Sequence, residues 1–142
     1  MGELNMSREE RETFLADLHV GVIAVERADG PPLAAPVWYR YSPGGVVEIL
    51  TERTSIKGRL LDAAGRASIC AQRESLPYAY VTVEGPVEIA EATLEDRTDM
   101  AVRYLGDAGG RQYVEQSPVV DDVVVRITPE RWFSVDYGKL EQ

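Results

Sequence analysis

Short runs of apolar and β-branched residues, separated by turn-forming residues, make up most of the chain. Runs of this kind between glycine, proline or aspartate are typical of β-strands. An Asp-Gly pair at residues 29–30 and Ser-Pro-Gly-Gly at residues 42–45 predict tight turns, so we expect the first three strands to form an antiparallel meander. The predicted strands are residues 20–26, 33–41, 46–50, 67–71, 79–89, 123–127 and 131–135.

Helix-start signals interrupt this strand pattern. Ser7 and Thr93 each begin a capping box, and Ser55 fits the N-cap of a helix over residues 56–64. A further short helix is predicted around residues 112–115. The helix after Thr93 is expected to bury one apolar face, formed by Leu94, Ala101, Tyr104 and Leu105.

This order of elements predicts a mainly β protein with peripheral helices. Many short strands with few helices favour a closed or split antiparallel β-barrel, in a single domain over residues 1–142. Pro36 inside the second strand indicates an edge, a bulge or a position that faces a ligand. Gly85 and Pro86 in the fifth strand indicate a bulge or a sharp bend, as barrels use at their corners.

Charge and hydropathy exclude two classes of partner. Fifteen Lys and Arg against 24 Asp and Glu give a net charge of −9, which repels nucleic acid and anionic lipid. The apolar runs are far shorter than the ~20 residues that a membrane span needs, and the polar start resembles no signal peptide. We therefore expect a cytoplasmic protein with no nucleic-acid or membrane partner.

Cysteine and histidine are too few for several kinds of chemistry. Cys70 is the only cysteine, so neither an internal disulfide nor a cysteine-based zinc site can form. Its neighbours are apolar, which predicts a buried, inert thiol in a strand. His19 is the only histidine, and nothing near it indicates a Ser-His-Asp or Cys-His arrangement.

A basic segment stands out in this acidic chain. Between Arg53 and Leu61 there are three cations and no acid, and the segment coincides with the start of the predicted helix at residue 56. Free N–H groups and the helix dipole favour an anion there, and Lys57 in the first turn would add a charge. A short capped helix with solvated cations is the alternative interpretation.

The segment Ala35–Tyr39 carries a proline and two large aromatic residues. Such a strand can present backbone groups and flat faces to a planar ligand. Simple alternation is the alternative, in which Val37 and Tyr39 face the core and Trp38 faces outward.

The order of these segments resembles the pyridoxamine 5′-phosphate oxidase-like split-barrel family, which binds flavins. The resemblance covers about residues 19–137, and its most characteristic parts are Pro-Val-Trp at residues 36–38 and Tyr-Val-Thr-Val-Glu-Gly-Pro-Val-Glu at residues 80–88. Within the family the chain looks most like the actinobacterial branch that uses coenzyme F-420, an 8-hydroxy-5-deazaflavin.

The resemblance implies where a cofactor would bind. Its phosphate would lie at the start of the helix over residues 56–64, and its ring along the second strand. The implied residues are Thr51, Ser55, Lys57 and Arg59 for the phosphate, Pro36, Val37 and Trp38 for the ring, and Tyr80 on an adjacent strand. The FMN oxidases usually have an arginine just before the phosphate lysine, where this chain has Ile56, and this favours F-420 over FMN.

The implied function is an oxidoreductase in which reduced F-420 delivers a hydride to an electrophilic carbon of a small organic substrate. A proton would come from solvent or from a tyrosine such as Tyr39 or Tyr78. The resemblance also implies a homodimer with cofactor sites at the interface. Exposed aromatics at Trp132, Phe133 and Tyr137 would suit such an interface, or they close the monomer's core.

Two other functions stay open at this point. One is an FMN-binding oxidase or reductase on the same fold. The other is a non-catalytic carrier that holds F-420, a flavin or another planar ligand.

Overall fold

The computed structural model describes residues 2–118 and 121–141. Over these residues it contains seven strands, three α-helices and two short 3-10 helices at Gly2–Leu4 and Tyr137–Glu141. The strands are β1 (Gly21–Val25), β2 (Leu33–Val37), β3 (Val47–Glu52), β4 (Arg66–Arg73), β5 (Ala79–Glu91), β6 (Asp122–Ile127) and β7 (Arg131–Asp136). The helices are α1 (Arg8–Ala16), α2 (Ile56–Ala64) and α3 (Leu94–Gln116).

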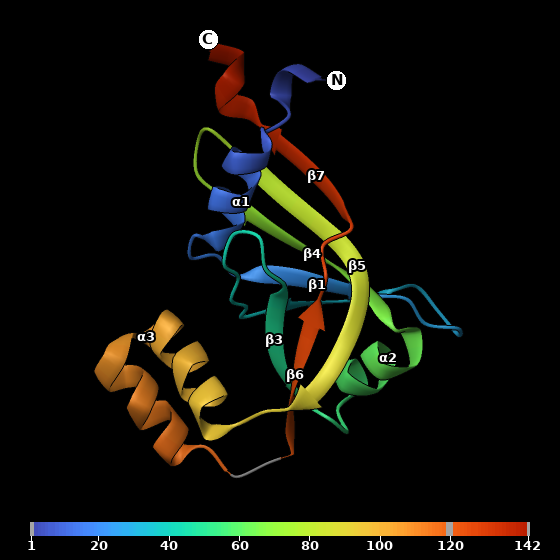
Figure 1. Ribbon diagram of the computed structural model, residues 1–142, viewed down its shortest axis with the longest axis vertical. Coiled ribbons are helices and arrows are strands. Elements are labelled where there is room, and N and C mark those ends of the chain that lie inside the picture. Colours follow the sequence, from blue (N-terminus) through green and yellow to red (C-terminus); the bar gives the residue numbers. More distant parts are fainter. Residues whose placement is uncertain (1, 119–120, 142) are drawn as a thin grey trace.

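The strands form one antiparallel sheet in the order β2-β1-β4-β5-β6-β3, with β7 paired to β5. β5 is long and strongly curved (Figure 1), and it changes partners along its length. Its first part pairs with β4 and β7, and from Val87 onward it pairs with β6. The predicted bend at Gly85 and Pro86 lies where these partners change. A Cβ on Gly85 would lie 1.7 Å from the Thr128 carbonyl oxygen, so only glycine permits this close crossing.

The predicted meander of three strands is wrong at its third strand. β1 and β2 pair as a hairpin, but β3 pairs along its whole length with β6. β2 ends at Val37, and the chain then leaves the hairpin and meets β3 through a single bridge between Arg40 and Glu48. This crossing curls the sheet into a half-barrel. The architecture is therefore mainly β with peripheral helices, and it confirms the predicted split antiparallel barrel.

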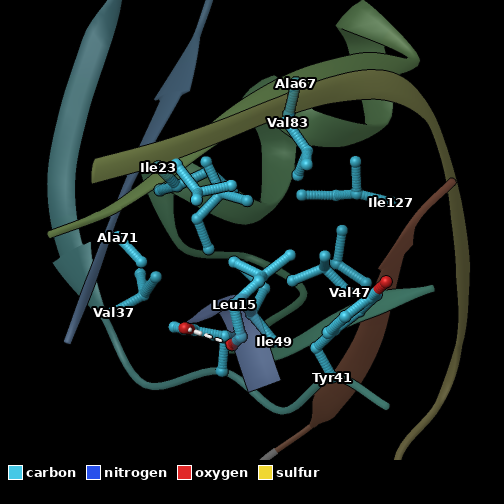
Figure 2. Packing of buried hydrophobic residues seen from close by; sticks show 14 of the residues in the cluster. Leu15, Ile23, Val37, Tyr41, Val47, Ile49, Ala67, Ala71, Val83 and Ile127 are labelled. Atoms are coloured by element: carbon cyan, nitrogen blue, oxygen red, sulfur yellow. Dashed lines mark hydrogen bonds between the residues drawn. The ribbon is translucent and has the colours of Figure 1, made fainter. Parts of the chain in front are cut away.

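One apolar core fills the half-barrel. Alternate residues of the strands point inward, which gives burial patterns such as buried, half-buried, buried along β3 and β4. Figure 2 shows Leu15 of α1 among Ile23, Val47 and Ile49, so that α1 covers one end of the core. Burying each such side chain stabilises the fold by about 1.5–3 kcal/mol relative to exposure.

The predicted helix starts at Ser7, Ser55 and Thr93 are all confirmed as N-caps. The predicted apolar face of α3 is only partly right. Leu94 and Leu105 are exposed, whereas Ala101 is buried. The helix breaks directly after Leu105, at Gly106, where φ is +82° and the helix reverses direction.

The break divides α3 into two limbs, residues 94–105 and 107–116, which Figure 1 shows as a helical hairpin beside the barrel. The predicted short helix around residues 112–115 lies in the second limb. The limbs touch at Gly110, where a Cβ would lie 2.5 Å from the Val102 backbone nitrogen. Among the described helices, none combines the length and the apolar character needed to cross a membrane.

Candidate functional site

A cavity of about 590 Å³ lies between the barrel and α3. This volume falls within the roughly 300–1,000 Å³ of typical small-molecule sites. The barrel side is formed by the ends of β2 and β3 and the first turn of α2, and the other side by both limbs of α3. Residues from the barrel side include Val20, Pro36, Val37, Trp38, Leu50, Thr51, Glu52 and Lys57. Residues from the α3 side include Arg97, Met100, Ala101, Tyr113, Val114 and Ser117.

Polar groups gather where β3, β6 and α2 meet. Thr51 is buried, and its hydroxyl lies 3.1 Å from the Ser55 hydroxyl. Arg97 of α3 pairs with Asp122 of β6 at 3.4 Å. Burial raises the pKa of the Asp122 carboxyl, and this rise outweighs the opposing effect of Arg97. This part of the cavity therefore holds the cations of Lys57 and Arg97, the carboxyl groups of Glu52 and Asp122, and the Thr51 hydroxyl.

The start of α2 is shaped to hold an anion. The Ser55 hydroxyl accepts a hydrogen bond from the Gly58 N–H at 3.0 Å and donates to the Glu52 carbonyl at 2.8 Å. The N–H groups of Ile56 and Lys57 have no hydrogen-bond partner among residues 2–118 and 121–141, and neither does the Lys57 ammonium. Because helix N-termini favour negative charge, these three donors could hold a phosphate or carboxylate.

Aromatic and apolar side chains form the rest of the cavity. Trp38 stacks on Tyr104 of the first α3 limb, with ring centroids 4.9 Å apart and planes 7° apart. Tyr113 of the second limb approaches Trp38 at 5.9 Å with a tilt of 52°. Met100 is buried at the same wall. The cavity thus suits a ligand that combines an anionic group with a flat, largely apolar ring.

Five of the eight predicted binding residues line this cavity. They are Pro36, Val37, Trp38, Thr51 and Lys57. They come from the end of β2 and the residue after it, from β3, and from the first turn of α2.

The other three predicted residues lie outside the lining. Ser55 adjoins it through its hydrogen bond to Thr51. The Arg59 guanidinium donates to the Thr54 carbonyl at 2.8 Å, which ties it to the outer side of the loop before α2. Tyr80 lies on the outer face of the sheet, opposite Gln72 and Val135, because β5 turns its alternate residues away from the core there.

The remaining candidates are engaged elsewhere. Arg53 forms ion pairs with Glu91 and Asp121 and does not line the cavity. The Tyr39 hydroxyl donates to the Leu15 carbonyl at 2.7 Å within the core, and burial raises the pKa of Tyr39. Tyr78 is half exposed and is also absent from the cavity lining. Neither tyrosine is placed to give a proton to a ligand in this cavity.

Sequence reasoning missed the α3 side of the cavity. Arg97, Met100 and Ala101 recur at helical spacing, so one face of the first limb could have been found from periodicity. Tyr113 could not, because the reversal at Gly106 decides which face of the second limb turns to the barrel. Asp122 is hidden in the sequence as the polar start of an apolar strand.

The outer face of the sheet carries a row of mostly apolar side chains that ends at the cavity. The strand registers place Pro36, Val22, Cys70, Thr82 and Phe133 side by side across β2, β1, β4, β5 and β7. Val22 is 42% and Phe133 51% exposed. Cys70 is half-buried in this row, so the prediction of a buried thiol is wrong, since β4 turns this residue outward.

The half-barrel of antiparallel strands, with a cavity at the first turn of a short helix, is that of a split-barrel protein. The chain belongs to the pyridoxamine 5′-phosphate oxidase family, whose model matches residues 7–136. This confirms the family that the sequence resembles. No curated protein matches the chain.

Solved structures share this fold. A conserved hypothetical protein of Mycobacterium tuberculosis is 26% identical, with a TM-score of 0.82 over 100% of this chain and 92% of that one. An F-420 reductase is 22% identical, with a TM-score of 0.62 over 86% of this chain and 94% of that one. A FAD-binding protein of Mesorhizobium loti is 22% identical, with a TM-score of 0.67 over 92% and 94% of the two chains. At these identities the last two likenesses concern the fold alone.

Proposed function

We propose that this protein is a cytoplasmic oxidoreductase that uses the deazaflavin coenzyme F-420 to transfer a hydride to an electrophilic carbon of a small organic substrate. The observation that carries the proposal is a set of three donors at the polar part of a cavity with an aromatic wall. They are the Lys57 ammonium and two N–H groups of α2, and none has a hydrogen-bond partner among the residues that the structure describes. An F-420 reductase among proteins of the same fold supports it.

The residues present fit an anionic, ring-bearing cofactor. Lys57 and the N–H groups of Ile56 and Lys57 would hold the phosphate, and the Thr51 hydroxyl lies beside them. Pro36 and Trp38 would flank the ring. The Ile56 side chain is 65% exposed and offers no charge at the position where the FMN oxidases usually have an arginine. Without that charge, we expect the binding of a compact terminal phosphate, as in FMN, to be weakened more than the binding of a phosphate that continues into an anionic tail, as in F-420.

When bound, F-420 supplies a hydride from C5 of its ring. The chain's own contribution is to anchor the phosphate, to align the ring with the substrate and to exclude water. Trp38, stacked on Tyr104, would fix the plane of the ring, and Met100 and Tyr113 would cover it from the α3 side. The Asp122 carboxyl lines the cavity, where it pairs with Arg97 and has a pKa raised by burial.

The test is a side-by-side titration with F-420 and FMN. We expect tighter binding of F-420, and we expect Lys57→Ala to weaken it by about tenfold to hundredfold, because a charge-assisted hydrogen bond contributes about 1.5–3 kcal/mol. Lys139→Ala is the matched control, because Lys139 is the other lysine of the chain. It pairs with Glu10 and does not line the cavity. Its affinity for F-420 should stay at the wild-type value.

Other outcomes would overturn parts of the proposal. Tighter binding of FMN than of F-420 would favour the FMN-binding oxidase. Tight binding of reduced F-420 without its oxidation by any of a broad panel of unsaturated acceptors would favour the carrier. Unchanged affinity for F-420 in Lys57→Ala would mean that the phosphate does not bind at the start of α2.

We also propose that two copies pair through the outer sheet face. The exposed row from Pro36 to Phe133 supports this, because Pro36 belongs both to the row and to the cavity, so a partner would complete the cavity's rim. Light scattering should give a dimer. Val22→Lys should yield a monomer with weaker F-420 binding, and a wild-type monomer that binds F-420 would contradict the shared site.

A further inference from the structure

The β1–β2 hairpin ends beside the cavity. The last pair in its register is Gly21 opposite Val37. Continuing the antiparallel register by two residues on each strand would set His19 opposite Tyr39. No strand pairing is formed there, although the apolar pattern continues beyond Val37.

The hydroxyl of Tyr104, from the first limb of α3, lies between these two residues. The Tyr39 N–H donates to the Tyr104 Oη at 3.0 Å. The same Oη lies 2.7 Å from the His19 carbonyl oxygen and 2.9 Å from the Tyr39 carbonyl oxygen. Because a hydroxyl carries one proton, it accepts from the N–H and donates to one of the carbonyls at a time. The phenol therefore satisfies backbone groups that a continued ladder would have paired.

The ring of Tyr104 contacts Trp38, the residue between Val37 and Tyr39. Trp38 stacks on it almost in parallel, at 4.9 Å. Arg103, the preceding residue, donates to the Tyr39 carbonyl at 2.9 Å and to the Asp17 carbonyl at 3.0 Å, which fixes α3 at the same place. Tyr104 does not line the cavity, but Trp38 and Val20 do. Any effect of Tyr104 on a ligand must therefore act through the residues that it holds.

We propose that Tyr104 is a positioning residue that wedges apart the segments continuing β1 and β2, at His19 and Tyr39, and fixes Trp38 as a wall of the cavity. The wedge ends the ladder at Val37 and turns the residues at the gap, Val20 and Trp38, toward the cavity. The proposal rests on the proposed function only in naming F-420 as the ligand whose ring meets Trp38.

Two substitutions separate the two contacts of Tyr104. Tyr104→Phe removes the hydroxyl and keeps the stacking ring, and Tyr104→Leu removes both. Tyr41→Phe is the matched control, because the buried Tyr41 also loses a hydroxyl that bonds Glu12 and the Gly44 N–H away from the cavity. All variants carry Trp132→Phe, so that Trp38 is the only tryptophan.

The first measurements use the protein without ligand. We expect Tyr104→Leu to lower the fluorescence anisotropy of Trp38 and to remove its near-ultraviolet circular dichroism band. Amide exchange at Tyr39 should accelerate in both Tyr104 variants, because its N–H loses its acceptor. In Tyr41→Phe all three signals should match the parent protein. If Tyr104→Leu does not fold, the Tyr39 exchange rate in Tyr104→Phe decides whether Tyr104 acts as a wedge.

The second measurement is the dissociation constant for F-420. Tyr104→Phe should bind about threefold to tenfold more weakly, the equivalent of one net hydrogen bond, while Tyr41→Phe should stay at the parent value. Unchanged Trp38 signals and unchanged Tyr39 exchange in the Tyr104 variants would overturn the wedge. Equal losses of affinity in Tyr104→Phe and Tyr41→Phe would also overturn it. If the wild type binds no F-420, the proposed function fails, and the ligand-free signals still decide the wedge.

Discussion

The half-barrel and α3 are held in place by different interactions. In the barrel, strands pair along their length around a core whose centre, including Ile23, Ile69 and Val83, is fully buried. α3 buries far less apolar surface, chiefly Met100 and Ala101. It is attached instead by polar contacts of its first limb, which include the Tyr104 hydroxyl, the Arg103 guanidinium and ion pairs of Asp96 and Arg97.

This difference separates stability from ligand binding. Apolar burial is roughly proportional to area and stabilises the whole fold. Hydrogen bonds and ion pairs contribute less net stability but depend strongly on geometry. We therefore expect changes in the barrel to act mainly on the free energy of unfolding. Changes in α3 should act mainly on the shape of the cavity that lies between the two.

A pair of leucines tests this contrast most strongly. Leu61 is fully buried against the barrel core, and Leu94 is 66% exposed at the start of α3. Leu61→Ala should lower the free energy of unfolding by about 2–5 kcal/mol, the range for buried leucines. Leu94→Ala should change it by less than about 0.5 kcal/mol. Urea denaturation measures both, and similar losses would contradict the division.

Two neighbouring glycines test the hairpin of α3. A Cβ on Gly110 would lie 2.5 Å from the Val102 backbone nitrogen, whereas one on Gly109 would meet Leu105 at an ordinary 3.5 Å. Gly110→Ala should force the limbs apart at a cost of about 1–3 kcal/mol, as in other overpacked sites. It should also weaken F-420 binding, because Tyr113 moves with the second limb.

Gly109→Ala is the control for this experiment. It should stabilise the protein by roughly 0.4–1 kcal/mol, since alanine is favoured over glycine where its conformation and space allow it. Unfolding in urea and F-420 titration give both readouts. Equal effects of the two substitutions would show that the limbs do not depend on close contact at Gly110.

The same contrast explains what the sequence could predict. Strand alternation and capping boxes are local, so the barrel strands, the bend at Gly85 and the helix starts at Ser7, Ser55 and Thr93 were all within reach. The pairing of β3 with β6 was not, because it depends on residues 38–41 leaving the hairpin. That departure is set by Tyr104, which is distant in sequence.

The candidate site divides in the same way. The barrel side of the cavity, with Trp38, Thr51 and Lys57, follows from segments that the family resemblance covers. The α3 side depends on one backbone conformation at Gly106, which orients Tyr113. Tyr80, which the resemblance alone put beside the cofactor, lies outside the lining because the alternation along β5 turns it to the outer face of the sheet.

The smallest expected effect concerns one ion pair that anchors α3. Asp96 accepts from the Thr93 N–H at 2.9 Å and pairs with Arg40 at 2.7 Å. Burial opposes its ionisation, but these two contacts outweigh it and lower the pKa of Asp96 below its usual value of 3.8. Because folding favours the carboxylate, its contribution is complete above the unfolded pKa and is lost as pH falls through the lower, folded pKa.

Asp96→Asn keeps the shape of the side chain and removes this charge. At pH 7 it should lower the free energy of unfolding by about 0.3–1 kcal/mol, the usual size of a charge effect at a helix N-terminus. The difference from the wild type should shrink as the pH falls below about 4, because the wild-type carboxyl then gains its proton.

Asp107→Asn is the control: Asp107 pairs with Arg111 on the exposed surface of the second limb, where a salt bridge contributes little. Urea unfolding of all three proteins at several pH values gives the comparison. A loss for Asp96→Asn that does not change with pH would mean that hydrogen-bond geometry, and not charge, attaches this end of α3 to the barrel.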